Sequence, residues 1–373
     1  MANRVFLHVG LPKTGTTYLQ TLMWHNHEEL VRQGVLLPGE SNRQHLWASG
    51  VVRDDPKIDR RGPEARHAWS RLVEEVNAWA GTAVISHEFF ASASADQAQR
   101  AAAALTGAEV HVVVTARETV SLVTTAWQEL VKNGSTLPID RFPQLERSGP
   151  HVDWTWAALD LADVLERWGS AVPHDRVHVL TLPKPGEPRE TLWLRFAALV
   201  GIDPAPCRTE ASARNESLGV VEAELLRRVN AQLEGFSSAQ DRGNWIRGYL
   251  AHGKLVPRGG DKFWPSDEQV AELRNRGQRI ADAVAAGGYD VIGDVADLQP
   301  PRELPDRRHP DDVADAELVS AAVEVLAAMM TDVRRLTRQN RSLKDRLDRR
   351  VSRRAAARLR RSLGRVRPVW SRS

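Results

Sequence analysis

Two glycines with a lysine between them mark the part of this sequence best suited to chemistry. Residues 5–9 form a mostly apolar run, which leads into a turn containing Gly10, Lys13 and Gly15. Residues 16–30 continue with apolar side chains at helical spacing. A strand, a turn and a helix in this order present free backbone N–H groups and the positive end of a helix dipole. The stretch therefore predicts a site for a phosphate or a similar anion.

The position of the lysine limits the chemistry that this turn can serve. Kinases and ATPases of the P-loop type carry Lys-Ser or Lys-Thr directly after the second glycine, aimed at the β- and γ-phosphates. Here Thr16 and Thr17 occupy those two places, and Lys13 lies inside the turn. Its charge is therefore aimed at the near end of a shorter phosphate chain.

A second cationic candidate, Arg117, follows the most apolar strand that the sequence predicts, at 110–115. Ligands of parallel α/β sheets bind at the carboxyl ends of the strands. The planar guanidinium of arginine suits bidentate recognition of a phosphate. The alternative is a surface arginine that pairs with a nearby carboxylate such as Glu118.

A third polar cluster, His87 and Glu88, follows the strand predicted at 82–86. Histidine and glutamate are both common general bases. The alternative is a hydrogen-bonded core histidine beside a glutamate at a helix start.

The Pro-Lys-Thr-Gly-Thr-Thr turn at residues 12–17 resembles the 5′-phosphosulfate-binding loop of sulfotransferases that use 3′-phosphoadenosine 5′-phosphosulfate (PAPS). In that family an arginine and a hydroxyl residue, usually serine, hold the 3′-phosphate. The resemblance assigns these roles to Arg117 and Thr125, which are eight residues apart. Tyr18 stands where many relatives carry an adenine-stacking tryptophan, and its alternative role is a core aromatic. The nucleotide-binding residues that the resemblance implies are Lys13, Thr14, Gly15, Thr16, Thr17, Tyr18, Arg117 and Thr125.

The resemblance also implies a reaction, the transfer of a sulfuryl group from PAPS to a hydroxyl or amine without a metal ion. The acceptor would be a carbohydrate, a lipid or another small molecule. Lys13 would stabilise the charge that develops on the leaving group. His87 matches the catalytic base of the cytosolic type, whereas other branches use a glutamate, which leaves Glu88 as the alternative base. The histidines of the chain show no metal-ligand spacing with acidic residues or cysteine.

Two other classes of function remain open. One is a P-loop nucleotide kinase or NTPase, which the missing lysine after Gly15 argues against. The other is a non-catalytic scaffold that keeps a degenerate nucleotide site and assembles through a coiled coil. The presence of Lys13, Arg117 and the pair His87 and Glu88 argues against a degenerate site.

Alternation of strands and helices predicts an α/β fold, a P-loop-like three-layer sandwich with a central parallel sheet. Strands are expected near 4–9, 82–86, 110–115 and 177–181. The 373 residues divide into an expected sulfotransferase domain at 1–300, a Pro-rich linker at 301–312 and a helical extension at 313–373. A single cysteine fits a reducing compartment. No stretch reads as a signal peptide or a membrane span, so we expect a cytoplasmic protein.

The C-terminal extension differs from the rest of the chain in charge and in periodicity. Residues 349–373 hold ten arginines and no acidic residue, whereas residues 1–348 carry a net charge of −7. Between residues 326 and 347, apolar residues recur with a heptad spacing interrupted by Asn340, which predicts a coiled coil and a homo-oligomer. The alternative is an amphipathic helix that folds onto the enzyme body. The arginines predict a peripheral contact with an anionic membrane surface or, as the alternative, with nucleic acid.

Overall fold

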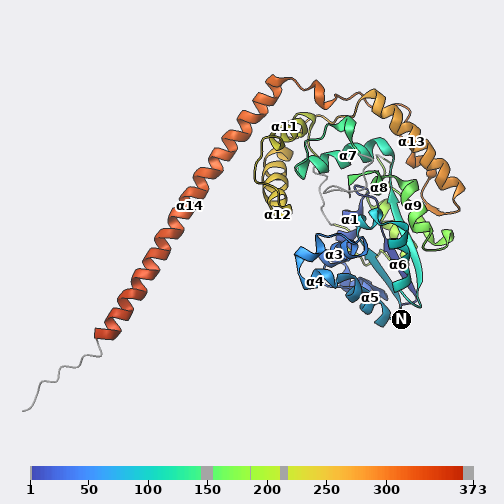
Figure 1. Ribbon diagram of the computed structural model, residues 1–373, viewed down its shortest axis with the longest axis horizontal. Coiled ribbons are helices and arrows are strands. Elements are labelled where there is room, and N and C mark those ends of the chain that lie inside the picture. Colours follow the sequence, from blue (N-terminus) through green and yellow to red (C-terminus); the bar gives the residue numbers. More distant parts are fainter. Residues whose placement is uncertain (1, 144–153, 185, 211–216, 364–373) are drawn as a thin grey trace, which may run out of the picture. The chain divides into compact units, whose positions relative to one another are not determined.

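The computed structural model describes residues 2–143, 154–184, 186–210 and 217–363, with backbone alone for 348 and 350–363. It divides into two compact units at Val313 and Ala314 (Figure 1). The Gly- and Pro-containing stretch at 133–150 also reads as a loop that could gate a site. Part of this stretch, like the end of the basic tail, lies outside the described residues.

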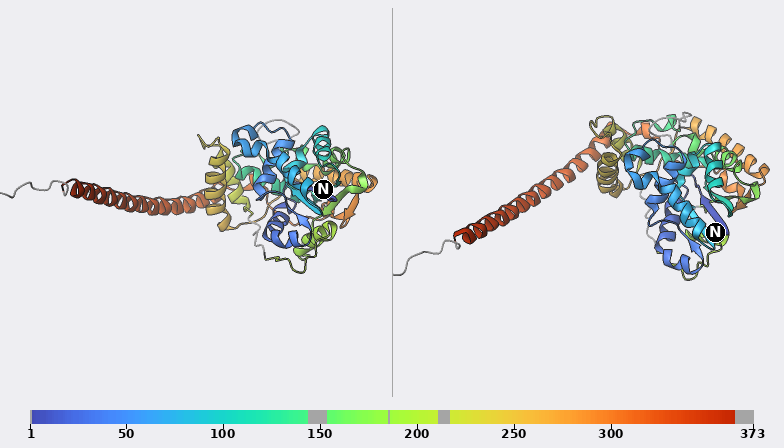
Figure 2. Two further views of the ribbon diagram at one scale, coloured as in Figure 1. Left: turned by 90° about the horizontal axis from the view of Figure 1, so that it is seen from below. Right: turned by 60° about the horizontal axis from the view of Figure 1, so that its bottom comes forward.

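The first unit is built around a six-stranded sheet with the strand order β2-β3-β1-β4-β5-β6, and every pairing is parallel. Parallel strands need crossover connections, and helices provide these between all consecutive strands. Figure 2 shows these helices packed around the sheet. The strands are β1 Arg4–His8, β2 Val35–Leu36, β3 Thr82–Ser86, β4 Glu109–Ala116, β5 Val177–Thr181 and β6 Asp290–Ile292.

One face of the sheet carries the hydrophobic core that positions the first helix. Phe6, Val84 and Val113 come from the three central strands and share this face, because side chains alternate along a strand. They belong to one buried cluster with Leu19 of α1 (Thr16–His25) and Phe196 of α10 (Glu190–Val200). The first helix is thus held against the sheet directly behind the turn that precedes it.

The opposite face is equally apolar and is covered by a second layer of helices. Leu7, Ile85 and Val114 point to this side and are fully buried. Helix α9 (Leu161–Gly169), which takes no part in the first core, packs against β4 and β5. Two helical layers with a parallel sheet between them make the three-layer α/β sandwich that the sequence predicts. The remaining helices of this unit are α2 His27–Arg32, α3 Asn42–Val52, α4 Pro63–Arg66, α5 Ala68–Ala78, α6 Ala95–Ala104, α7 Thr119–Lys132, α8 Trp156–Leu159, α11 Val220–Asn230, α12 Ala239–Asp241, the π-helix Arg242–Leu255 and α13 Asp267–Ala286.

All four strands expected from the sequence are present, and the differences lie in short elements. The edge strand β6 was not expected, because three residues beginning with an aspartate give no apolar run. The sequence pattern also predicts one helix from about Asp153 to Trp168, and this is wrong as one element, since α8 and α9 meet at Asp160. The Asp160 carboxylate accepts a hydrogen bond from the Ala162 amide and so starts a new helix. The pattern at 239–251 predicts a further helix, and most of that range is the π-helix Arg242–Leu255.

The described part of the second unit is the long helix α14 (Asp315–Leu363, 49 residues; Figure 1). A helical extension was expected over 313–373, and within that range the structure describes a helix over Asp315–Leu363. Among the described residues, none of the helices is both long enough and apolar enough to cross a membrane.

Candidate functional site

The turn between β1 and α1 adopts a conformation that depends on its glycines. Gly10, Lys13 and Gly15 all have positive φ angles, of 52°, 67° and 83°. A Cβ atom at Gly10 would lie 2.5 Å from Thr16 Cγ2, and one at Gly15 would lie 2.5 Å from Leu192 Cδ2. A non-glycine residue with positive φ is uncommon, so Lys13 is held in a strained conformation. No side chain caps the start of α1, so its first N–H groups point into the turn without an intrahelical partner.

The side chain of Thr14 fixes this turn to the neighbouring strand. Its hydroxyl donates to the Leu11 carbonyl at 2.6 Å and lies 2.7 Å from the Thr115 hydroxyl. The Leu11 amide also donates to the Thr115 carbonyl at 3.1 Å. Thr14 is fully buried, so its hydroxyl serves the structure of the turn, and nucleotide binding by Thr14 remains a prediction for its backbone only.

Beneath the turn, a row of buried polar side chains crosses the ends of three strands. His8 Nδ1 lies 2.8 Å from Ser86 Oγ, and His8 Nε2 lies 3.3 Å from Thr115 Oγ1. Burial lowers the pKa of His8 to about 4, with smaller opposing effects of Glu88, which raises it, and His87, which lowers it further. His8 is therefore neutral at physiological pH and links β1 to β3 and β4 without adding charge.

His45 supports the end of β3 from helix α3. Its Nδ1 accepts the Ser86 amide at 3.1 Å, and its Nε2 donates to the Pro38 carbonyl at 2.7 Å. Burial lowers the pKa of His45 to about 4, although its two backbone hydrogen bonds oppose that shift. This histidine is neutral and structural, and it holds the strand end that leads to His87.

Lys13, the residue expected to meet the anion, already contacts a buried carboxylate. Its Nζ donates to Glu129 Oε2 of α7 at 3.1 Å, and Arg247 from the π-helix pairs with Glu129 Oε1 at 2.7 Å. Only 5% of the Glu129 side chain is exposed, against 31% for Lys13 and 46% for Arg247. This cluster of one acid and two bases joins the turn, α7 and the π-helix.

The charge state of Glu129 follows from two opposing effects. Burial raises the pKa of its carboxyl, but Lys13, Arg247 and Lys132 together outweigh burial and hold the pKa below its ordinary value. Glu129 is therefore ionised at neutral pH, and it cancels part of the positive charge that surrounds the turn.

Arg117 differs from Lys13 because its side chain forms no ion pair with a carboxylate in the described residues. The nearest candidate, Glu118, uses its carboxylate to cap α7, accepting the Val120 amide at 2.7 Å and the Ser121 amide at 2.9 Å. Within the described part of the chain, the half-buried guanidinium of Arg117 makes no hydrogen bond and no ion pair. Burial lowers the pKa of Arg117, with a smaller opposing effect of Glu118, but an arginine remains charged at neutral pH. A desolvated cation without a partner is costly unless an anion binds there.

Thr125 lies on the same side of α7 as the residue that contacts Lys13. It precedes Glu129 by four residues, so the two side chains are one turn apart on one helix face. Its hydroxyl donates to the Ser121 carbonyl at 2.6 Å, which leaves the oxygen lone pairs outward. Its expected contact with a 3′-phosphate would require that hydroxyl to rotate.

His87 and Glu88 lie directly after β3, next to the turn that follows β1. His87 Nδ1 accepts the Phe89 amide at 3.2 Å, so the proton of the neutral imidazole is on Nε2. The distance from His87 Nδ1 to Glu88 Oε2 is 3.9 Å, too long for the hydrogen bond of an oriented base pair. Glu88 instead accepts from Gln20 Nε2 at 3.3 Å. Burial raises the pKa of Glu88, but His87, its own backbone, Gln20 and His8 hold it below the ordinary value.

The remaining expected residues lie on the first helix. Thr16 is buried and Thr17 is exposed, at the first two positions of α1. Tyr18 belongs to the hydrophobic core with 7% of its surface exposed, and Arg189 covers its ring at 4.6 Å from the centroid. The structure thus gives Tyr18 the environment of a core aromatic, and we leave it out of the site proposed below.

Sequence reasoning missed three polar residues of this site, and one of them carried a usable signal. Glu129 stands in an otherwise apolar helix face four residues after Thr125, and this was a usable signal. His8 stands inside an apolar strand, and Arg247 lies in a segment without any pattern.

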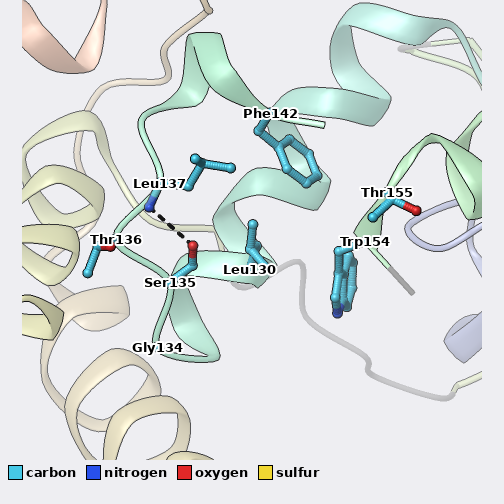
Figure 3. Close-up of a pocket in the computed structure, with 8 residues that line it drawn as sticks. All are labelled: Leu130, Gly134, Ser135, Thr136, Leu137, Phe142, Trp154 and Thr155. Atoms are coloured by element: carbon cyan, nitrogen blue, oxygen red, sulfur yellow. Dashed lines mark hydrogen bonds between the residues drawn. The ribbon is translucent and has the colours of Figure 1, made fainter. Parts of the chain in front are cut away.

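A pocket of about 290 Å³ opens beside the carboxyl end of α7 (Figure 3). Leu130, which follows Glu129, lies on one side of it, and Trp154 lies on another. Trp154 also packs edge-on against Phe89, whose ring is 5.0 Å from that of His87. The pocket is therefore lined by Leu130, the residue after the Lys13 partner Glu129, and by Trp154, which packs on the Phe89 ring beside His87. Its lining residues are Leu130, Gly134, Ser135, Thr136, Leu137, Phe142, Trp154 and Thr155.

Comparisons with known proteins add little to this geometry. No protein-family model matches the chain, and no curated protein matches it. A crystal structure of a sulfotransferase from Alicyclobacillus acidocaldarius is similar with a TM-score of 0.39 and 17% sequence identity. The match covers 62% of this chain and 94% of that chain. Similarity at this level assigns no function, so the side chains themselves must support one.

The two neutral histidines predict a loss of stability in acid. Both have pKa values of about 4 in the folded chain, so below pH 6.5 the unfolded chain binds more protons than the folded one. The free energy of unfolding should fall as the pH decreases from about 6.5 to 4, by about 1.4 kcal/mol per pH unit for each histidine. In His45→Gln, the amide can replace both hydrogen bonds without titrating. Urea unfolding at several pH values should show a shallower dependence for this variant, and parallel curves for the two proteins would contradict the assignment.

Proposed function

We propose that this chain is a PAPS-dependent sulfotransferase that moves a sulfuryl group to a hydroxyl or amine of a small-molecule, carbohydrate or lipid acceptor. The observation that carries the proposal is Arg117. Arg117 directly follows β4, which pairs with β1, and among the described residues its guanidinium makes no hydrogen bond and no ion pair. A nucleotide with phosphates at both its 3′ and 5′ positions needs two separate cationic sites of this kind.

The turn itself is suited to the 5′-phosphosulfate. Its positive φ angles, the tight packing around Gly10 and Gly15 and the uncapped helix start leave backbone N–H groups available to an anion. Lys13 would stay bonded to Glu129 and still have donors for the bridging oxygen, because an ammonium group carries three N–H bonds. The Arg117 guanidinium and the Thr125 hydroxyl would hold the unreactive 3′-phosphate, so their contribution is affinity and positioning.

The reaction breaks the bond between sulfur and the bridging oxygen of the 5′-phosphate and forms a bond from sulfur to the acceptor oxygen or nitrogen. Lys13 stabilises the charge that develops on the bridging oxygen. We assign to Glu88 the role of the base that removes the proton of the acceptor, because its carboxylate is ionised and 21% exposed. The lone pair of His87 Nδ1 is already used by the Phe89 amide.

The pocket beside α7 is the proposed acceptor site. It lies between Leu130 and Trp154, and both are next to residues that contact the candidate catalytic groups. Aromatic and aliphatic walls with the Ser135 and Thr136 hydroxyls suit an acceptor that is partly apolar and carries its own hydroxyl groups.

The two cations should have separable effects on nucleotide binding and on turnover. The wild-type chain should bind 3′-phosphoadenosine 5′-phosphate more tightly than adenosine 5′-monophosphate, and calorimetry measures both. Arg117→Ala should weaken the binding of 3′-phosphoadenosine 5′-phosphate by about 10- to 100-fold and remove most of its preference over adenosine 5′-monophosphate. Lys13→Ala should keep the preference but lower kcat by about a hundredfold or more.

Arg100→Ala serves as the control, because it removes an exposed arginine whose one ion pair among the described residues is with Asp54. If the wild-type chain does not distinguish the two nucleotides, the assignment of Arg117 to a 3′-phosphate is wrong. If it hydrolyses ATP instead, the chain belongs to the NTPase class.

Glu129 should restrain Lys13 at some cost in nucleotide affinity. Glu129→Gln removes one negative charge beside the turn, so binding of 3′-phosphoadenosine 5′-phosphate should tighten several-fold while kcat falls by about tenfold. The stability loss should be about 1 kcal/mol, because both basic partners are partly exposed.

The matched control is Glu224→Gln, which alters another buried glutamate with two arginine partners, Arg227 and Arg228. Equal effects of both variants on affinity and kcat would show that Glu129 has only a structural role.

Substitutions at the proposed base should affect kcat, whereas a substitution in the proposed acceptor pocket should affect KM. Glu88→Gln should lower kcat by about a hundredfold with PAPS binding unchanged, and His87→Asn should have the smaller effect. Trp154→Ala should raise the KM for the acceptor and leave nucleotide affinity unchanged. These constants require an acceptor, which a screen of metabolites with radiolabelled PAPS would supply. Near-normal kcat in both Glu88→Gln and His87→Asn would place the base elsewhere.

A further inference from the structure

Helix α14 carries an apolar stripe that the described residues leave open to solvent. Eight of its large apolar side chains are exposed, and five of these make up the stripe with 48% to 60% of their surface exposed, namely Leu326, Val333, Leu336, Leu343 and Leu347. A helix in water is normally polar on its exposed side, and a continuous apolar row marks an interaction surface.

The spacing of the stripe is that of a coiled coil. Leu326, Val333, Asn340 and Leu347 are seven residues apart and occupy the a positions of a heptad. Met329, Leu336 and Leu343 follow three residues after the first three of these and occupy the d positions. The mean period of 3.5 residues keeps this seam on one side of a supercoiled helix over about 32 Å.

We propose that the occupant of this seam is α14 of a second copy of the chain, parallel and in register. The single polar residue of the seam, Asn340, favours this arrangement. In a parallel pair it faces Asn340 of the other copy, and the two amides can hydrogen-bond. In an antiparallel pair centred on Val333 and Leu336, it would face Met329 and leave its amide without a partner in an apolar layer.

The positions beside the seam tolerate the parallel register. It brings Asp332 near Thr337 and Gln339 near Lys344 of the other copy, so no like charges face each other there. Farther along, residues 333–363 hold thirteen basic and two acidic residues, whereas residues 315–332 hold four acids and no base. Parallel chains therefore bring their basic segments together, and this repulsion weakens as salt is added. Antiparallel chains would pair opposite charges, and their association would weaken with salt.

Sedimentation equilibrium of the full chain measures the state of association. The wild type should have twice the chain mass of 41.5 kDa. Leu343→Asp places a charge in the seam and should raise the dissociation constant by about a hundredfold or more. Ser342→Asp introduces the same side chain one residue away, outside the seam, and should leave the dimer intact.

Orientation is tested by cross-linking a Leu347→Cys, Cys207→Ser double variant. A parallel pair brings the two introduced thiols together and should give an oxidised dimer, whereas an antiparallel pair separates them by about 40 Å.

Added salt should tighten the association of the parallel pair. A monomeric wild type, equal effects of Leu343→Asp and Ser342→Asp, or binding of the stripe to lipid vesicles by a monomer would overturn the proposal. A dimer without the cross-link, or one that salt weakens, would overturn its parallel register.

Discussion

The hydrogen bond between the hydroxyls of Thr14 and Thr115 is the contact on which the geometry of the site depends. It ties the β1–α1 turn to β4 at 2.7 Å, and His8 continues the connection from Thr115 to Ser86. The three strand ends that lead to Lys13, His87 and Arg117 are thereby fixed to one another by buried polar groups. A shift of the turn would break several of these bonds together, and it is disfavoured because an unsatisfied buried hydroxyl is costly.

The two cations expected to bind the anion, Lys13 and Arg117, differ in whether they form an ion pair. Lys13 is bonded to Glu129, which Arg247 also contacts, whereas Arg117 makes no ion pair in the described residues and feels only a smaller effect of Glu118. This difference suits two different tasks. A group that acts on the reacting atoms needs a fixed position, and a group that binds an unreactive phosphate needs unspent charge.

Sequence reasoning succeeded where a local pattern reports a local structure. The turn around Lys13 and the strands before His87 and Arg117 follow from apolar runs and glycine spacing, and parallel pairing then brings their ends to one edge. It failed for Glu129 and Arg247 because their roles depend on contacts between distant segments. Lys13 and Glu129 are 116 residues apart, and no local pattern predicts that they meet.

The two buried histidines of this polar edge of the sheet leave its charge to other side chains. With pKa values of about 4, His8 and His45 supply hydrogen bonds without charge, so the positive potential comes from Lys13, Arg117 and Arg247. Glu129 offsets one of these charges, and Glu88 adds a negative group on the side of β3. Lys13 and Arg117 therefore follow β1 and β4, whereas Glu88, the proton acceptor that we propose, follows β3 on the other side of β1. In the proposed function, this separation would direct the anionic donor and the neutral acceptor to different sides of one site.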